Sequence, residues 1–363
     1  MLGKARGIVE NHDDPILLGK GVGVNKAVTA VPAVDPFAAH DRPRTATRRR
    51  LVADVGGTFA RLAWASEADG QPLADGLQRF PCAGYASLAA IVRAFADEQP
   101  LDEVEAVVAI AGVVQGDTLV NANLPWPVSI ELTRRAAGLA ALHLINDFEA
   151  VALAVPYLQA ERLQPLVGAA PHRFDWPALV LGPGTGLGAA LRMQGGERPV
   201  LASEVGHAAL AAGNEQELDV LRLLLRRWPH VDSERVLSGM GLLNLYQCLC
   251  ELAGSAPVFS TTESLLAAAN AQQDTLAIET VQVFCGWLGS YVGDLAIAFG
   301  ARAVYLTGGI PGHITGFLHD GRFAQRFLNK GVLLPVLATV PVWRVDGGEL
   351  GVLGAVVWQE AGQ

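Results

Sequence analysis

The sequence predicts an α/β fold in two domains. Short apolar runs typical of strands alternate along the chain with segments whose apolar residues recur at helical spacing. Glycine is abundant, with 40 residues, and several glycines cluster at turns after apolar runs, which suits an α/β protein whose sites are lined by backbone. A length of 363 residues is sufficient for two domains with substantial cores.

The composition narrows the class of protein. A net charge of −9 argues against a general nucleic-acid surface or an anionic membrane surface, although backbone amides can still hold an anionic substrate. The late apolar region is interrupted by Asp294 and Arg302, and the N-terminus has no apolar core of a signal peptide. We therefore expect a soluble cytoplasmic enzyme with no nucleic-acid partner and no membrane partner.

The cysteines have no metal-binding spacing, so reduced structural thiols are expected. They are Cys82, Cys248, Cys250 and Cys285. Residues 1–48 have little sustained periodicity and are expected to form a flexible N-terminal extension rather than a domain.

The first ordered element is a strand over residues 51–55, followed by Gly56-Gly57-Thr58 and a second strand over 59–65. Gly56 and Gly57 are able to take positive φ and would let an anion approach the backbone of this hairpin. Thr58 adds a hydroxyl, and Asp54 at the end of the strand is placed to orient a hydrated Mg²⁺. The alternative is a plain hairpin turn, which needs glycine but has no need of Asp54.

Strands and helices then alternate: a helix over 88–96, a strand over 105–111 and a helix over 129–138. The central stretch follows, in which a short buried strand end at 143–145 leads into a helix with Asn146 as N-cap. Asp147 stands where this strand becomes a helix N-terminus, a position that favours the ionised carboxylate and suits a base facing a cleft. The alternative is that Asp147 only caps the helix.

A polar connection is expected over 159–177, and then a second glycine cluster with Gly184, Thr185, Gly186 and Gly188. Its spacing formally fits a dinucleotide fingerprint, with Glu204 at the expected distance. We reject that interpretation because a strand, not a helix, follows the glycines. Two strand–turn–strand glycine hairpins instead suggest two similar halves that face one ligand.

Glu204 and His207 lie three residues apart, and no third metal ligand is nearby. Hydrogen bonding to a polyol suits this pair better, and a buried structural histidine is the alternative. Ser233 is expected to cap a helix that includes Glu234, which would then be either a ligand or only a partner of the helix dipole.

The last part of the chain predicts one long helix over 274–299 and a strand over 304–310 that ends in Gly308-Gly309, where a flat adenine could lie against bare backbone. A strand over 340–345, a glycine turn and an apolar helix complete the chain.

Six motifs in this order resemble the bacterial ATP-dependent glucokinases, over about residues 50–358. They are Asp54-Val55-Gly56-Gly57-Thr58-Phe59-Ala60-Arg61, Ile145-Asn146-Asp147-Phe148, Gly182-Pro183-Gly184-Thr185-Gly186-Leu187-Gly188, Glu204-x-x-His207, Glu234-Arg235-Val236-Leu237-Ser238-Gly239 and Thr307-Gly308-Gly309-Ile310. Each motif is weak alone, but the ordered set is specific.

The resemblance implies the two-domain actin-like ATPase (ribonuclease H-like) fold with a cleft between domains, and phosphorylation of glucose at the 6-hydroxyl. It implies a small domain over 49–157 plus 344–363, a large domain over 158–343 and a homodimer. It also implies Asp147 as general base and Mg·ATP as donor, with no direct protein ligand to the metal. The implied glucose ligands are Asn146, Asp147, Glu204, His207 and Glu234. The implied ATP contacts are Asp54, Gly56, Gly57, Thr58, Gly184, Thr185, Gly186, Gly308 and Gly309.

The sequence departs from the family pattern at Phe59, where Asn is usual, at Val205, where Gly is usual, and at Met240, where Pro is usual. The residues leave open a kinase for another hexose or an amino sugar, a polyphosphate donor, and a non-catalytic sugar sensor on the same fold. A sensor usually adds a helix-turn-helix, for which residues 1–48 offer no paired helical pattern.

Overall fold

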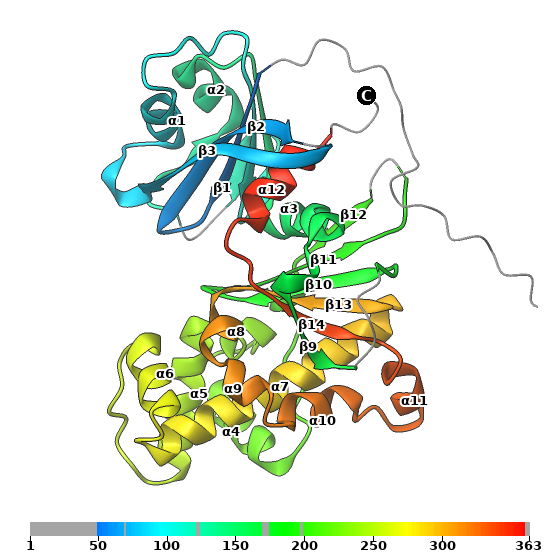
Figure 1. The fold of residues 1–363 in the computed structure, drawn as a ribbon. Helices are drawn as coiled ribbons and strands as arrows, with labels where there is room; N and C mark the ends of the chain where they lie inside the picture. Colours follow the sequence, from blue (N-terminus) through cyan, green and yellow to red (C-terminus); the bar gives the residue numbers. More distant parts are fainter. Residues whose placement is uncertain (1–48, 69, 121–123, 169–173, 197–198, 360–363) are drawn as a thin grey trace, which may run out of the picture. The chain divides into compact units, whose positions relative to one another are not determined.

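A computed structural model describes residues 49–359 except 69, 121–123, 169–173 and 197–198. The predicted N-terminal extension over 1–48 lies outside the described residues. Within the described part, the elements form two larger β-sheets and one small sheet, with helices packed on them (Figure 1).

The first large sheet has five strands in the order β3-β2-β1-β4-β8. Its strands are β1 (Arg50–Val55), β2 (Phe59–Ala68), β3 (Gln71–Pro81), β4 (Glu105–Ile110) and β8 (Ala141–Asn146). β1 pairs antiparallel with β2 and parallel with β4, which in turn pairs parallel with β8. The predicted strands at 51–55, 59–65 and 105–111 are confirmed within a few residues. β3, with mostly exposed residues, was not predicted.

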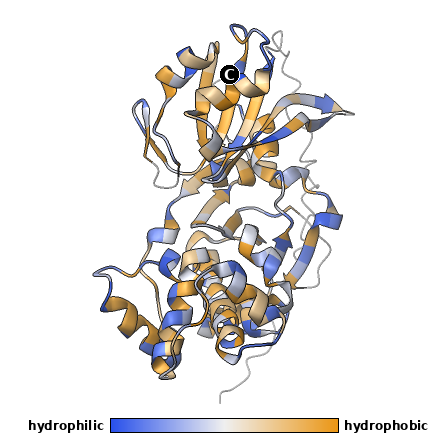
Figure 2. Ribbon diagram, turned by 90° about the vertical axis from the view of Figure 1, so that its left-hand side faces the viewer, coloured by the Kyte–Doolittle hydropathy of each residue, from blue (hydrophilic) through white to orange (hydrophobic). Residues whose placement is uncertain are grey.

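Alternation along β1 sends its side chains to two different cores. Leu51, Ala53 and Val55 pack with helices α1 (Leu88–Ala96) and α2 (Ile130–Ala137), whereas Val52 packs with α12 (Leu350–Val357) on the other face. Figure 2 shows the central strands of this sheet mostly in the colour of hydrophobic residues, as two-sided burial requires, whereas the hairpin at its edge also carries hydrophilic residues.

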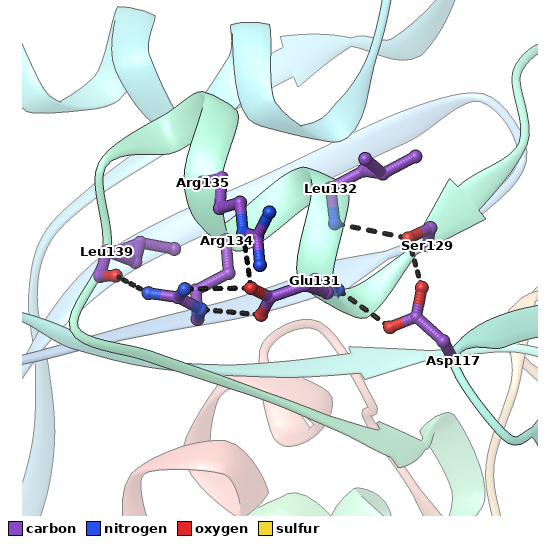
Figure 3. A network of polar contacts seen from close by, with 7 residues as sticks. All are labelled: Asp117, Ser129, Glu131, Leu132, Arg134, Arg135 and Leu139. Carbon is purple, nitrogen blue, oxygen red and sulfur yellow. Dashed lines mark hydrogen bonds and ion pairs between the residues drawn. The ribbon is translucent and has the colours of Figure 1, made fainter.

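The predicted helix over 129–138 is confirmed as α2, and local side-chain contacts define its ends (Figure 3). Ser129 Oγ accepts a hydrogen bond from the Leu132 N–H at 3.1 Å and donates to Asp117. Glu131 forms a two-point ion pair with Arg134 at 2.8 and 2.9 Å. Gly138 ends the helix with φ of +79°, a left-handed conformation that glycine adopts without strain.

The second large sheet has six strands in the order β12-β11-β10-β13-β14-β9. Its strands are β9 (Leu163–Val167), β10 (Ala178–Pro183), β11 (Leu187–Arg192), β12 (Val200–Ser203), β13 (Ala303–Leu306) and β14 (Val342–Val345). β10 and β11 form an antiparallel hairpin, so the rejection of a dinucleotide-binding helix after the glycines is confirmed. The prediction of a polar connection over 159–177 is wrong for β9, which pairs antiparallel with β14 at the sheet edge.

Helices cover one face of this sheet, and their apolar residues form the largest core. They include α4 (Glu215–Leu225), α5 (Gly239–Leu252), α6 (Thr262–Asn270), α7 (Thr275–Phe299) and α10 (Arg322–Leu328). The shorter helices are α8 (Gly309–His313), α9 (Thr315–Leu318) and α11 (Leu334–Leu337). The small sheet consists of β5 (Val113–Gln115), β6 (Thr118–Val120) and β7 (Val128–Ser129).

The long helix α7 confirms the prediction over 274–299, with Asp274 as its N-cap. It is the one helix among the described residues that is long and apolar enough to cross a membrane by length and composition alone. However, 67% of its most apolar window is buried in the core. The four cysteines are free and buried, as predicted.

The prediction that Ser233 caps a helix is wrong. Asp232 caps a single 3₁₀ turn, Ser233–Arg235, by accepting from the Arg235 N–H at 2.9 Å. α5 begins only at Gly239, where Ser238 is the N-cap and accepts from the Gly241 N–H at 3.0 Å. Glu234 therefore belongs to the 3₁₀ turn and not to the first turn of α5.

Helices α3 (Asp147–Ala154) and α12 lie between the inner faces of the two large sheets. α3 contacts β8 and β4 of one sheet and β10, β11 and β12 of the other. Their mutual approach is close: a Cβ on Gly354 of α12 would lie 1.8 Å from the carbonyl oxygen of Ala150. The predicted domain limits, 49–157 with 344–363 and 158–343, stay a prediction.

This helix pair generates the first prediction. Gly354→Ala places a methyl group against the backbone carbonyl of Ala150, which cannot rotate away, so the helices must separate. We expect the free energy of unfolding to fall by about 1–3 kcal/mol, the usual cost of overpacking. Chemical denaturation followed by circular dichroism measures it.

Gly348→Ala is the matched control, because no atom lies within 4 Å of its Cβ position and its φ is not left-handed. If both variants unfold at the wild-type denaturant concentration, the α3–α12 contact is not a packing constraint.

Candidate functional site

Asp147 stands at the junction predicted for it. β8 ends at Asn146 and α3 begins at Asp147. Asn146 Oδ1 accepts hydrogen bonds from the N–H groups of Phe148 at 2.9 Å and Glu149 at 3.2 Å, so the predicted N-cap is confirmed. Because Asn146 supplies the cap, Asp147 is not required for that role, although its Oδ1 also accepts from the Phe148 N–H at 3.0 Å.

The environment of Asp147 suits a proton acceptor. Loss of water around the half-buried side chain is the main cause that raises the pKa of Asp147 to about 6. The negative charge of Asp54 raises this pKa further, and that of Glu204 adds a smaller contribution, while backbone hydrogen bonds lower it. A carboxyl group with this pKa is mostly ionised at neutral pH and still basic enough to take up a proton.

Phe148 anchors this junction to the second sheet. Its ring lies against two glycines of the β10–β11 hairpin: a Cβ on Gly182 or Gly188 would come within 2.8 or 2.0 Å of the ring. These glycines thus make room for Phe148, and a contact across elements explains them. The sequence carried no separate signal for this contact.

The turn of that hairpin, residues 184–186, is the second predicted glycine loop. The Gly184 N–H donates to the Gly186 carbonyl at 2.8 Å. No atom lies within 4 Å of a Cβ on Gly184, and its φ is not left-handed, so the fold itself does not demand glycine there. An open position of this kind leaves space for a ligand to approach the backbone.

The β1–β2 turn, residues 56–58, is the first predicted glycine loop. The Gly56 N–H donates to the Phe59 carbonyl at 3.0 Å, and the Thr58 carbonyl accepts from the Cys82 N–H at 2.9 Å. Gly57 and Thr58 are exposed. Neither Gly56 nor Gly57 takes the left-handed φ that glycine permits. Phe59, the departure from the family pattern, lies under the guanidinium of Arg79 at 3.5 Å.

Asp54 lies at the end of β1, on the face that packs with α12. Arg61 Nη1 donates to its Oδ2 at 3.1 Å, and a Cβ on Gly351 would lie 2.7 Å from its carboxyl carbon. Burial raises the pKa of Asp54, although Arg61 opposes the change. Asp54 also bears on the pKa of Asp147, so the two carboxylates interact electrostatically. The described residues contain no group of three potential metal ligands.

The third predicted glycine segment, Gly308-Gly309, follows β13. The strand ends at Leu306, not at Ile310 as predicted, and α8 begins at Gly309. Gly308 has φ of +97°, and its Cβ position lies only 2.5 Å from the Pro183 carbonyl oxygen. Gly308 therefore adjoins the end of β10, one residue before the 184–186 turn begins. Gly309 has open space around its Cβ position.

A cavity of about 380 Å³ lies next to Asn146. Its polar wall consists of Asn146, Glu149, Ser203 and Glu204. The rest of its lining is apolar or glycine: Ile110, Gly112, Val113, Val114, Leu119, Leu144, Ile145 and Ala202. The sequence predicted Asn146 and Glu204 as sugar ligands but missed Glu149 as a candidate site residue.

Asp147, His207 and Glu234 do not line this cavity. His207 is mostly exposed, with its Nδ1 3.8 Å from Asp232 Oδ2, so the alternative of a buried structural histidine is wrong. The 3₁₀ turn Val205–His207 packs closely on β11: a Cβ on Gly206 would lie 2.3 Å from the Leu187 carbonyl oxygen, so glycine makes this approach possible. Glu234 lies on the opposite, N–H side of the same residue: its Oε2 accepts from the Leu187 N–H at 2.8 Å.

Several of the predicted residues thus lie around the start of β11 and the end of β8, where the two large sheets approach across α3. Asp54, Asp147 and Glu204 interact electrostatically, Glu234 contacts the 184–186 turn, and Gly308 adjoins the end of β10. Such an arrangement combines a proton acceptor, polar groups that can hold a polyol, and two open glycine backbones.

Known proteins are similar to this chain in sequence and in fold. The family model described as Glucokinase matches residues 51–361. A "Glucokinase-like protein" of Xylella fastidiosa is 40% identical over 314 residues, which are 85% of this chain and 93% of that protein.

Among solved structures, a glucokinase from an Antarctic psychrotroph superimposes with a TM-score of 0.74 at 32% identity, covering 86% of this chain and 98% of that one. A ROK family glucokinase from Streptomyces griseus, determined with glucose and AMPPNP, has a TM-score of 0.55 at 18% identity. It covers 85% of this chain and 98% of that one, and at this identity the likeness concerns the fold alone. The predicted actin-like ATPase fold is confirmed by these neighbours. The chain belongs to the glucokinase family.

Proposed function

We propose that this chain transfers the γ-phosphoryl group of ATP to the 6-hydroxyl of glucose, with Asp147 as the general base. Membership of the glucokinase family supports glucose phosphorylation in general. The observation that supports the finer assignment is Asp147 itself: a half-buried carboxyl group with a pKa of about 6, directly after Asn146, which lines the cavity.

We assign the sugar to the cavity lined by Asn146 and Glu204. These two side chains present an amide and a carboxylate, which donate to and accept from vicinal hydroxyls. His207 and Glu234 complete the proposed set from two 3₁₀ turns that pack on β11. The glucose bound in the Streptomyces griseus structure supports a sugar as the ligand of this fold.

ATP is assigned to the three glycine segments: Gly56, Gly57 and Thr58, then Gly184, Thr185 and Gly186, then Gly308 and Gly309. The open backbone at Gly184 and Gly309 supports this assignment, because a side chain there would fill space that the fold leaves free. Exposed amides at such turns stabilise phosphate charge. Mg²⁺ bound with ATP would neutralise charge on the phosphates, and Asp54 is the residue proposed to hold it through water.

In the proposed reaction, the 6-hydroxyl oxygen attacks the γ-phosphorus while the bond from this phosphorus to the β–γ bridging oxygen breaks. Asp147 accepts the hydroxyl proton, and ADP leaves with the electron pair of the broken bond. A positioned base contributes roughly 10²–10⁴-fold. Alignment of the reactants and fixed backbone dipoles supply most of the remaining acceleration.

The substrate assignment is tested by measuring ADP release with Mg·ATP in the presence of glucose, mannose, fructose, N-acetylglucosamine or no sugar. We expect brisk turnover with glucose, because the family and the polar wall of the cavity both fit a hexose. Turnover with another sugar alone would keep the reaction class but overturn the substrate. Sugar binding by calorimetry without any turnover would overturn the enzyme and favour a sensor.

Asp147→Asn tests the base. The amide keeps the size of the side chain but cannot take up a proton, so turnover is expected to fall at least about a hundredfold while calorimetric glucose affinity stays close to that of the wild type. The wild-type rate should rise with pH through an apparent pKa near 6, the pKa of Asp147. A variant that keeps wild-type turnover would remove Asp147 from this role.

The same variant tests stability. The pKa of Asp147 is about 6 in the folded protein, above the ordinary value of 3.8, so between these values the folded state binds more protons than the unfolded chain. The stability associated with the protonated group is therefore present below about pH 4 and lost as pH rises through about 6. Asp147→Asn avoids this loss.

We expect Asp147→Asn to have a higher Tm than the wild type at pH 7.5, and a smaller difference at pH 4.5. Differential scanning calorimetry at the two pH values measures it. An equal or lower Tm at pH 7.5 would show that the environment of Asp147 does not disfavour its charge.

A further inference from the structure

Glu234 connects the proposed sugar site to the proposed nucleotide turn. Its Oε2 accepts a hydrogen bond from the Leu187 N–H at 2.8 Å, directly after the 184–186 turn. The same oxygen lies 2.5 Å from the Cβ position of Gly186, so only glycine leaves room for the carboxylate here. One oxygen of Glu234 is thus committed to the backbone of the turn.

The second carboxylate oxygen of Glu234, Oε1, does not take part in the hydrogen bond to Leu187. Among the described residues, no group donates a hydrogen bond to Oε1 of Glu234, and the side chain is only half-buried. A carboxylate has about four acceptor positions, so Oε1 remains available to a hydroxyl. The 3₁₀ turn Val205–His207, which follows Glu204, packs against the 3₁₀ turn that contains Glu234, so both turns of the proposed sugar set lie side by side.

The segment that carries Glu234 also holds the other end of the nucleotide turn. The Gly239 N–H donates to the Gly184 carbonyl at 2.9 Å. Thr262 Oγ1 in turn donates to the Gly239 carbonyl at 2.8 Å. Ser238 Oγ donates to the Glu234 carbonyl at 2.7 Å, so residues 234–239 form one hydrogen-bonded unit. This unit is hydrogen-bonded to both ends of the 184–186 turn, through the Gly184 carbonyl and the Leu187 N–H.

We propose that Glu234 is a positioning residue that couples binding of the sugar to binding of the nucleotide. A sugar hydroxyl that donates to Oε1 restricts the carboxylate, and the restricted Oε2 then holds the Leu187 N–H and the 184–186 turn in the arrangement that receives phosphates. The inference rests on the proposed function, because it takes the sugar and ATP assignments as its two ends.

Coupling of this kind is reciprocal. If the sugar raises the affinity for nucleotide by some factor, the nucleotide must raise the affinity for sugar by the same factor, and couplings between sites typically lie at roughly 5–150-fold. A residue that only binds sugar would change sugar affinity and leave this factor unchanged. The factor therefore separates a coupling role from simple ligation.

The experiment measures the Kd of glucose by isothermal titration calorimetry with and without saturating AMPPNP and Mg²⁺, and the Kd of AMPPNP without glucose. For the wild type we expect at least about a fivefold tightening of glucose by AMPPNP. For Glu234→Ala we expect this factor to fall close to one, and AMPPNP alone to bind more weakly, because the Leu187 N–H loses its acceptor.

Glu234→Gln is the matched variant. Its amide oxygen still accepts from the Leu187 N–H, so AMPPNP alone should bind nearly as in the wild type. If Glu234→Ala does not fold, as judged by its Tm, Glu234→Asp replaces it, since a side chain shorter by one methylene cannot reach both partners. His207→Ala is the control: among the described residues, its side chain forms no hydrogen bond or ion pair with the 184–186 turn and lies 3.8 Å from Asp232, so this variant should weaken glucose binding and keep the wild-type factor.

A wild-type factor close to one, or a wild-type factor retained in Glu234→Ala and Glu234→Asp, would overturn the coupling role. Wild-type turnover with glucose is measured first on the same preparation. Absence of turnover with every sugar would reject the proposed function, whereas turnover without coupling rejects only the role of Glu234.

Discussion

The contact between the Phe148 ring and the backbones of Gly182 and Gly188 determines the rest of the site. It joins the first turn of α3 to the β10–β11 hairpin, which belongs to the other large sheet. Aromatic rings approach backbone this closely only where a neighbour has no side chain. Because Phe148 is the residue after Asp147, the contact sets the distance between the proposed base and the glycine turn that follows β10.

The same close approach creates the electrostatic character of the site. Bringing the two sheets together across α3 removes water from Asp147 and Asp54 and leaves the two carboxylates within each other's field. Like charges in a poorly hydrated region raise one another's pKa, at some expense to stability. The raised pKa of Asp147 suits its proposed role as a base, and Arg61 offsets part of the charge on Asp54.

Local signals predicted much of the fold and part of the candidate site. Asn146 is followed by helical periodicity, so its capping role was predictable from neighbouring residues alone. Capping preferences alone do not decide between two candidate caps. Ser233 and Ser238 both precede helix-like sequence, and only the tertiary structure shows that α5 begins after Ser238. β9 escaped prediction because its pairing with β14 involves residues almost 180 positions apart.

The sequence by itself determined the alternation of strands and helices, the strand-to-helix junction at Asp147, the two glycine hairpins and the ordered motifs of the family. These features depend on residues close together in the chain, whose propensities and caps act locally. Only the tertiary structure decided that Phe148 fills the space of two glycines, that Glu149 lines the cavity, and that Glu234 holds the Leu187 N–H. Each of these depends on long-range contacts, and no local pattern encodes the distance between side chains that meet only when the sheets pack.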